Sequence, residues 1–370
     1  MNYIITGNTY NSKFIEELAK RDDIIAMSGE ELENSNIYFA PLDKVYVPSE
    51  TSLSIVMDRM QDKSYVNGIN KLKNKYFCRE ALSSIYPDFY FAKAALADIP
   101  SLKFGDKKVV IKPLKGFFGT GVRIADKDTD LHKLAYEMNL EVESSVKFFP
   151  ESILSKDEYI IEEFITGDEY AVDMFFDEQG KPAIMNIYFH PEPIIPEYFH
   201  LMYYTNKEIF DLYLDTFNRF FTELNGVLNL KNFPIHAEFK LQDGVMVPIE
   251  LNPMRYGGFG LADLTFNSYN FQPITAYFDD KPVDWYAIWK HRKQYNYAWI
   301  LGYNGKDVNM ETKEPNHEKF VQLLGVNNEI MDYVHLNHKT NPVFALAYLR
   351  NNNIILLKEL LGTEFNDFFA

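Results

Sequence analysis

A pair of alternating segments between residues 235 and 252 constrains the fold more than any other feature of the sequence. Apolar residues occupy every second position from Ile235 to Leu241, with polar residues between them. After an Asp-Gly pair, the alternation resumes from Val245 to Leu251. A period of two with a turn signal in the middle is typical of two half-buried strands joined as a hairpin. The chain therefore contains an antiparallel sheet with an apolar and a polar face.

The polar face of this hairpin carries Glu238, Glu250 and Asn252, which are hard oxygen ligands. A two-residue loop would pair Glu238 with Ile249, on mismatched faces. We therefore expect a loop of odd length, with Gly244 in a left-handed conformation, that brings Glu238 near Glu250. Clustered carboxylates repel each other unless a cation lies among them, and magnesium prefers oxygen ligands. The hairpin alone is equally compatible with a magnesium site and with a solvated sheet face.

The composition argues against several classes of partner. The 370 residues carry 37 Lys+Arg against 53 Asp+Glu, a net charge of −16, which disfavours nucleic acid or an anionic membrane as the main partner. A single cysteine, Cys78, excludes a disulfide framework and fits a reducing cytoplasm. The first residues do not resemble a signal peptide, and no apolar run approaches a membrane span. We expect a cytoplasmic protein of two or three domains, as a monomer or a homodimer.

The beginning of the chain predicts a small, mostly parallel sheet. A strand, an amphipathic helix and a second strand follow one another there, at residues 3–6, 13–21 and 24–27. A largely helical stretch at 54–86 comes next, and it carries the basic cluster Lys71, Lys73 and Lys75.

A glycine-rich loop follows the predicted strand Val109–Lys112. Gly116, Gly119 and Gly121 let backbone N–H groups approach an anion closely, and the flanking lysines favour phosphate. The loop is not a P-loop, because no Gly-Lys-Ser/Thr opens a helix. Taken alone, it is better explained as a hairpin turn without a ligand.

Strands and helices alternate through the rest of the chain. Residues 191–204 are rich in proline and aromatic residues and predict a long irregular loop, a class of segment that is often functional. Strands are expected at 159–165, 169–177, 182–189, 298–302, 331–336 and 343–349, and helices at 130–138, 207–225 and 354–361.

Taken in order, four motifs resemble the ATP-grasp superfamily of ligases. Each is weak alone, but their order over roughly residues 70 to 275 is specific. The motifs are Asn74-Lys75-Tyr76-Phe77-Cys78-Arg79, Val110-Ile111-Lys112-Pro113, Glu162-Glu163-Phe164-Ile165-x-Gly-x-Glu169 and Glu250-Leu251-Asn252-Pro253.

The resemblance implies an ATP-grasp fold of the α/β (α+β) class in three parts. An N-terminal pre-ATP-grasp domain with a parallel sheet would span 1–70, and a small C-terminal α+β subdomain would span 279–370. The ATP-grasp domain between them, 71–278, would divide into a small subdomain near 107–165 and a nucleotide-and-metal subdomain near 166–278.

The resemblance also implies a site for ATP phosphates and magnesium. Lys75 and Lys112 would hold the phosphates, and the loop Gly116–Gly121, which includes Gly119 and Thr120, would fold over the β- and γ-phosphates. Two magnesium ions, for which manganese can substitute, would be held by Glu238, Glu250 and Asn252.

The nucleoside would bind between two further strands according to the same resemblance. Glu162, with the backbone of Glu163 and Ile165, would read the adenine edge. Glu169 would accept hydrogen bonds from the ribose hydroxyls.

Arg255 departs from the family pattern. In many members the arginine directly follows Asn-Pro, whereas Met254 intervenes here. A shift of one residue reverses the direction of the side chain if the strand continues. If Pro253 ends the strand, Arg255 still reaches a phosphate or carboxylate, and we expect it to act with Lys112 in catalysis. The form NPMRYGG resembles a subgroup of bacterial ATP-grasp proteins but indicates no substrate.

The implied activity is an ATP-dependent, ADP-forming carboxylate–amine ligase that acts through an acylphosphate on a small molecule or peptide. A phosphotransferase and a nucleotide-binding module without turnover stay open as alternatives. Tyr203 and Tyr204 are candidates for the acceptor pocket. His190, His200 and His236 are expected to be structural, because this chemistry needs no general base.

Overall fold

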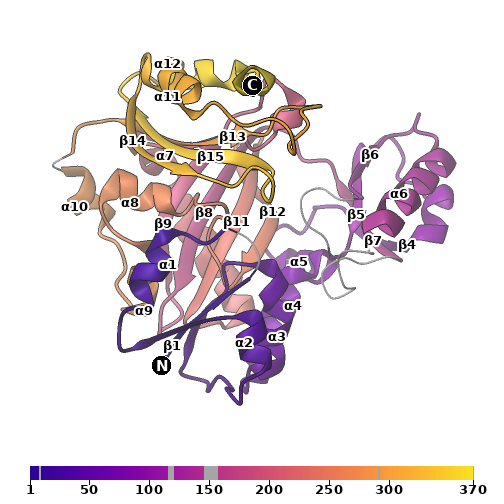
Figure 1. Ribbon diagram of the computed structural model, residues 1–370. Coiled ribbons are helices and arrows are strands. Elements are labelled where there is room, and N and C mark those ends of the chain that lie inside the picture. Colours follow the sequence, from indigo (N-terminus) through magenta and orange to yellow (C-terminus); the bar gives the residue numbers. More distant parts are fainter. Residues whose placement is uncertain (8–9, 116–120, 146–156, 291, 370) are drawn as a thin grey trace.

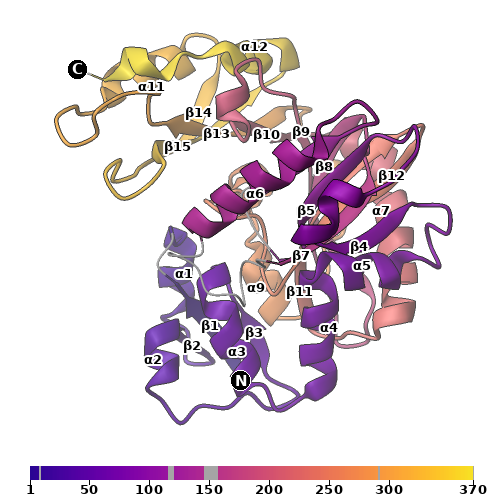
Figure 2. The ribbon, with the colours of Figure 1, turned by 90° about the vertical axis from the view of Figure 1, so that its right-hand side faces the viewer.

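Three sheets organise the protein in this computed structural model, which describes residues 1–7, 10–115, 121–145, 157–290 and 292–369. In the described residues the strand orders are β2-β1-β3, β12-β11-β8-β9-β10-β13-β15-β14 and β4-β7-β5-β6. Figure 1 shows the four-stranded sheet standing to the side of the large one. Figure 1 and Figure 2 both show the N-terminal helices at one end of the molecule and the C-terminal helices at the other.

The N-terminal sheet is parallel, as predicted. Strand β1 (Asn2–Thr6) pairs in parallel with β2 (Ile24–Ser28) and with β3 (Lys44–Tyr46). Helices α1 (Lys13–Leu18) and α2 (Gly29–Glu33) connect these strands, and Ser28 closes a capping box at the start of α2.

The predicted helical stretch divides into a short turn η1 (Glu50–Ser52) and three helices. These are α3 (Leu53–Arg59), α4 (Lys63–Lys73) and α5 (Lys75–Leu82). Asn74 separates the last two, because its backbone is extended and its side chain accepts from Tyr76 N and Phe77 N at the start of α5. This break sets Lys73 and Lys75 on consecutive helices.

The small sheet is antiparallel and packs on one helix. Its strands are β4 (Phe91–Ala95), β5 (Val109–Pro113), β6 (Arg123–Ala125) and β7 (Glu158–Glu163). Helix α6 (Leu131–Ser145) and the turn η2 (Leu96–Ser101) cover it, with Ile99, Ile111 and Met138 in a common core.

The large sheet joins the predicted hairpin to the C-terminal region. Its first strands are β8 (Asp168–Phe176), β9 (Pro182–His190), β10 (Met202–Thr205), β11 (Phe233–Gln242) and β12 (Val245–Pro253). Helix α7 (Lys207–Leu228) packs Phe217, Phe220 and Phe221 against Phe239 of β11. Apolar residues at helical spacing on α7 thus cover one face of the sheet.

The C-terminal strands extend this same sheet. β13 (Asn296–Tyr303) pairs with β10 and with β15 (Val343–Asn351), and β14 (Glu329–His335) forms the edge. The remaining helices and turns are α8 (Asp263–Tyr269), α9 (Pro273–Phe278), α10 (Trp285–Lys290), α11 (His317–Gly325), α12 (Ile354–Lys358), η3 (Pro196–Tyr198), η4 (Glu359–Gly362) and η5 (Phe365–Phe368). Among the helices of the described residues, none is both long and apolar enough to cross a membrane.

The prediction of a long irregular loop at 191–204 is partly wrong. It contains the turn η3, and its last residues form β10, where Tyr203 and Tyr204 pair with Trp299 and Ala298 of β13. Tyr203 and Tyr204 are therefore sheet residues, and both are buried.

The hairpin turn is also different from the prediction. The loop has two residues, Asp243 at φ 52° and Gly244 at φ 80°, rather than an odd number. A β-bulge restores the register: Glu238 pairs with Glu250 and Phe239 with Pro248, which leaves Ile249 as the extra residue. The predicted approach of Glu238 to Glu250 is therefore correct, although its cause is the bulge and not the turn.

Candidate nucleotide and metal site

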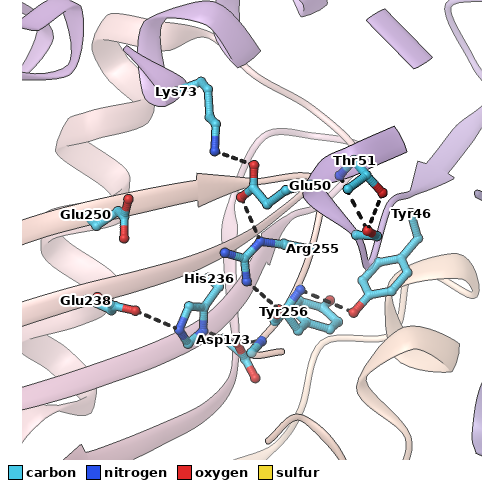
Figure 3. Close-up of polar contacts among 12 residues, drawn as sticks. Tyr46, Glu50, Thr51, Lys73, Asp173, His236, Glu238, Glu250, Arg255 and Tyr256 are labelled. Atoms are coloured by element: carbon cyan, nitrogen blue, oxygen red, sulfur yellow. Dashed lines mark hydrogen bonds and ion pairs between the residues drawn. The ribbon is translucent and has the colours of Figure 1, made fainter. Parts of the chain in front are cut away.

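Two acidic side chains face the same side of the hairpin. Glu238 and Glu250 are directly opposite each other on β11 and β12, and Figure 3 shows their carboxylates side by side. Asn252 is opposite His236 two pairs further along, and its Nδ2 is buried without a hydrogen-bond partner in the described part of the chain. The three predicted metal ligands therefore lie on one sheet face.

Glu250 lies among cations. Lys75 Nζ is 3.5 Å from Glu250 Oε1. Burial raises the pKa of Glu250, but Lys75, Lys73, Lys112 and Arg255 outweigh it and bring the pKa to about 2. The carboxylate is thus anionic at neutral pH, as a metal ligand must be.

Glu162 is the centre of a buried ion cluster. It forms an ion pair with Lys112 of β5, and its Oε2 accepts from Arg79 Nε at 2.8 Å. Arg79 Nη1 also donates to Pro248 O at 2.7 Å, so one guanidinium links β7 to the bulge of β12. Burial raises the pKa of Glu162, but Lys112 and Arg79 lower it to about 2. The bridging contacts of Arg79 were not predicted from the sequence.

The predicted ribose ligand Glu169 has a histidine partner. Its Oε1 lies 2.7 Å from His190 Nδ1, while His190 Nε2 lies 2.8 Å from Phe199 O. The His190 ring stacks on Tyr203, with centroids 4.1 Å apart and planes at 5°. Burial raises the pKa of Glu169, but His190 and Lys240 hold it below its usual value. Since Glu169 and His190 are paired across β8 and β9, their strand register was the signal that would have identified this contact.

The other adenine-reading candidates lie at the end of β7. Glu163 N donates to Tyr90 O at 3.0 Å, and Glu163 Oε2 lies 3.3 Å from Lys107 Nζ. Ile165 is buried just beyond the strand.

Arg255 turns away from the line of β12. The strand ends at Pro253, and Met254, which is fully buried, adopts φ 68°. Arg255 Nε then lies 3.3 Å from Glu50 Oε1, and Glu50 also pairs with Lys73 (Figure 3). Burial raises the pKa of Glu50, but Lys73 and Arg255 lower it overall. Pro253 thus ends the strand, as the prediction for Arg255 requires, and Glu50 is a partner of Arg255 that the sequence did not reveal.

His236 lies beside Glu238 and is buried. Its Nδ1 is 2.7 Å from Asp173 Oδ1, and its Nε2 is 3.5 Å from Glu238 Oε1. Burial lowers the pKa of His236, but hydrogen bonds to Asp173 and Glu238 raise it to about 9. The ring is therefore an imidazolium at neutral pH.

A pocket lies between α4, α5 and β12. Four predicted site residues line it, namely Lys75, Glu162, Glu250 and Asn252, together with Lys73 and Arg79. Cys78 also borders it, and burial raises the pKa of this thiol to about 11, so it is an unreactive wall residue. Of the glycine loop, Gly116, Gly119 and Thr120 lie outside the described residues, while Gly121 N donates to Glu141 Oε1 at 3.0 Å.

The fold and part of the sequence are similar to those of ATP-grasp proteins. Residues 106–263 match the sequence model of the ATP-grasp domain. The match includes β5, β7, β8, β11 and β12, which hold the predicted residues Lys112, Glu162, Glu163, Glu169, Glu238, Glu250 and Asn252. No protein with a curated description matches the sequence.

Solved structures agree on the fold. An L-amino acid ligase from Bacillus licheniformis has 15% identity and a TM-score of 0.67, over 100% of this chain and 98% of that one. An N5-carboxyaminoimidazole ribonucleotide synthetase from Thermotoga maritima has 12% identity and a TM-score of 0.61, over 100% and 98%. A biotin carboxylase from Campylobacter jejuni has 10% identity and a TM-score of 0.59, over 97% and 89%. At these identities the likeness establishes the ATP-grasp fold.

Proposed function

We propose that this protein is an ATP-dependent, ADP-forming ligase that joins a carboxylate to an amine through an acylphosphate. One observation carries the proposal: Glu238 and Glu250 face each other beside Lys75 and Arg255. Two carboxylates that face each other on a sheet, with cationic side chains around them, are better suited to bind a metal–phosphate complex than to lie in open solvent. The family match and the ligases and synthetases of the same fold support this assignment.

Magnesium fits the donors of the site. Glu238 and Glu250 offer anionic oxygens, and Nδ2 of Asn252 has no hydrogen-bond partner among the described residues. When bound with ATP, two such ions, or manganese in their place, would neutralise the charge on the phosphates. The residues that would hold them are Glu238, Glu250 and Asn252.

The nucleotide site uses residues that other contacts already orient. Glu162 holds Lys112, which would contact the phosphates together with Lys75. Glu162 and the backbone of Glu163 and Ile165 would read adenine, and Glu169, which contacts His190, would bind the ribose. The glycine loop would close over the phosphates.

The proposed chemical steps begin at the γ-phosphate, where the cationic side chains and the bound metal would concentrate positive charge. An oxygen of the substrate carboxylate attacks the γ-phosphorus, and ADP leaves. The amine then attacks the acyl carbon, phosphate leaves, and the amine loses a proton. Arg255, which Glu50 holds near the site, would orient the carboxylate and stabilise charge in both steps. Such positioning and charge stabilisation provide most of the catalysis of phosphoryl transfer.

We propose small-molecule or peptide substrates and a soluble cytoplasmic setting, without nucleic acid or membrane partners. The net charge of −16 and the L-amino acid ligase fold support this proposal. Two alternatives use the same nucleotide site: a phosphotransferase, and an ATP-binding module without turnover.

Isotope transfer separates these functions. A panel of acids and amines is first tested for ADP release, and the active carboxylate is then labelled with oxygen-18. The ligase passes one labelled oxygen into the released phosphate, a phosphotransferase retains the label in a stable phosphorylated product, and a module releases no ADP. Formation of AMP, or of unlabelled phosphate beside a condensation product, contradicts the proposal.

A further inference from the structure

Asp173 is a fully buried carboxylate with three donors from different parts of the chain. Its Oδ1 lies 2.7 Å from His236 Nδ1 and accepts from Gly257 N at 2.8 Å. Its Oδ2 accepts from Tyr188 OH at 2.8 Å. A buried carboxylate is stabilised only when such partners replace its water shell, so Asp173 and its donors are positioned as a unit.

The first branch of this unit reaches Glu238. Because Asp173 binds Nδ1 of His236, the opposite nitrogen, Nε2, is directed at Glu238 Oε1, 3.5 Å away. Figure 3 shows Asp173, His236 and Glu238 in that order along one line of contacts. The imidazole thus limits the orientations of a carboxylate that is otherwise partly exposed.

The second branch reaches Arg255. Gly257 N is fixed by Asp173, and Tyr256 N donates to Tyr46 OH at 3.2 Å. Between these bonds and the strand end, Met254 is held in a left-handed conformation that L residues adopt at a cost. The same carboxylate therefore restrains both the turn that carries Arg255 and the histidine that restrains Glu238.

We propose that Asp173 and His236 are positioning residues that orient Glu238 for the metal and couple it to the Arg255 turn. This inference rests on the proposed function, because Glu238 is a metal ligand only in that proposal. Neither residue touches a reacting atom. Partners that orient a metal ligand typically contribute about 10- to 100-fold to metal affinity.

Two substitutions of His236 separate its two contacts. His236→Gln carries an amide at the end of a longer side chain, where a donor to Glu238 is retained and the bond to Asp173 is lost. His236→Asn has a shorter side chain than His236→Gln, so it retains a donor to Asp173 and loses the contact with Glu238. Tyr188→Phe is the matched control, since it removes a hydrogen bond to Asp173 on the side away from Glu238.

The readout is Mn²⁺ affinity, measured by electron paramagnetic resonance with ADP and without carboxylate or amine, so that turnover is not required. We expect His236→Asn to weaken Mn²⁺ binding by about 10- to 100-fold. Tyr188→Phe should bind nearly as tightly as the wild type. His236→Gln keeps a donor to Glu238 but loses its contact with Asp173, so it should weaken Mn²⁺ binding less than His236→Asn does. Thermal unfolding of each variant identifies general loss of structure.

Hydrogen exchange tests the second branch. Asp173→Ala removes the acceptor for Gly257 N, so the peptide that contains residues 254–257 should exchange faster than in Tyr188→Phe. If Asp173→Ala does not fold, Asp173→Asn retains the oxygen that contacts both His236 Nδ1 and Gly257 N, so exchange and Mn²⁺ binding should both stay near the wild-type values, and faster exchange at 254–257 would overturn the restraint.

The outcomes distinguish this inference from the proposed function. Equal Mn²⁺ affinity in folded His236→Asn and wild type overturns the positioning role alone. Equal weakening in His236→Asn and Tyr188→Phe also overturns it, because the effect is then general packing. A wild-type protein that binds no Mn²⁺ with nucleotide overturns both the proposed function and the inference.

Discussion

The hairpin β11–β12 and the cluster around Arg255 lie next to each other but are assembled in opposite ways. The hairpin brings Glu238 and Glu250 together within a single turn of the chain. The Arg255 cluster requires Glu50 from the N-terminal part of the chain, 205 residues away in the sequence. A site of the first kind follows from local pattern, whereas one of the second kind depends on how distant segments of the chain pack together.

The largest effect should come from the locally assembled pair. Glu250→Gln removes an anionic ligand and leaves Lys75 without the charge 3.5 Å away, so turnover should fall about 1,000-fold. The measurement is ADP release at saturating ATP and magnesium. Glu329→Gln, which removes a carboxylate that pairs with Arg350 on an exposed edge, is the control and should retain activity. Wild-type magnesium dependence in Glu250→Gln would reject the metal assignment.

The buried cluster of Glu162 comes next and is sensitive to pH. Glu162→Gln leaves Arg79 and Lys112 buried without their counter-charge, so the free energy of unfolding at pH 7 should fall by about 3 kcal/mol. The folded pKa of about 2 lies below the ordinary 4.5, so this stabilisation is present above pH 4.5 and is lost as the pH falls through 2.

Urea unfolding of wild type and Glu162→Gln at several pH values measures that difference. The gap between the two proteins should be constant from pH 8 to pH 5 and should narrow below pH 4.5. A gap that widens on acidification would mean that Glu162 is not an anion in the folded protein.

The long-range cluster should show a smaller effect on chemistry. Arg255→Lys retains the charge but loses the planar fork, so kcat should fall about 10-fold with the KM for ATP unchanged. Equal changes in kcat and in the KM for ATP would assign Arg255 to nucleotide binding instead of the carboxylate. Unchanged kinetics would make its pair with Glu50 purely structural.

The sequence predicted the parts of the site that depend on periodicity. The alternation placed Glu238, Glu250 and Asn252 on one face, and the break at Pro253 was correctly tied to the direction of Arg255. The prediction of an odd loop failed because a bulge changes the register without changing the pattern. Pro248 was the available signal, since proline within a sheet is confined to edge strands and bulges, and β12 is an edge strand.

Contacts between distant segments left no such signal. Glu50 lies in a short turn among Ser49 and Thr51, and nothing in that stretch indicates that it faces Arg255. His190 and His236 were expected to be structural because the implied chemistry needs no general base. Their partners Glu169 and Asp173 come from β8, so only the order of strands in the large sheet reveals them.

The smallest effect tests whether the turn or the bulge sets the hairpin register. Gly244 has φ 80° and open space at its Cβ position, so Gly244→Ala should cost about 1 kcal/mol through backbone strain alone. Gly226 also has open space but lies within α7, so Gly226→Ala should stabilise by about 0.5–1 kcal/mol. Urea unfolding measures both changes.

Because the bulge at Glu238 and Phe239 makes Glu238 and Glu250 face each other, Gly244→Ala should retain wild-type Mn²⁺ affinity and ADP release. A loss of Mn²⁺ binding in a folded Gly244→Ala protein would instead assign the register to the turn.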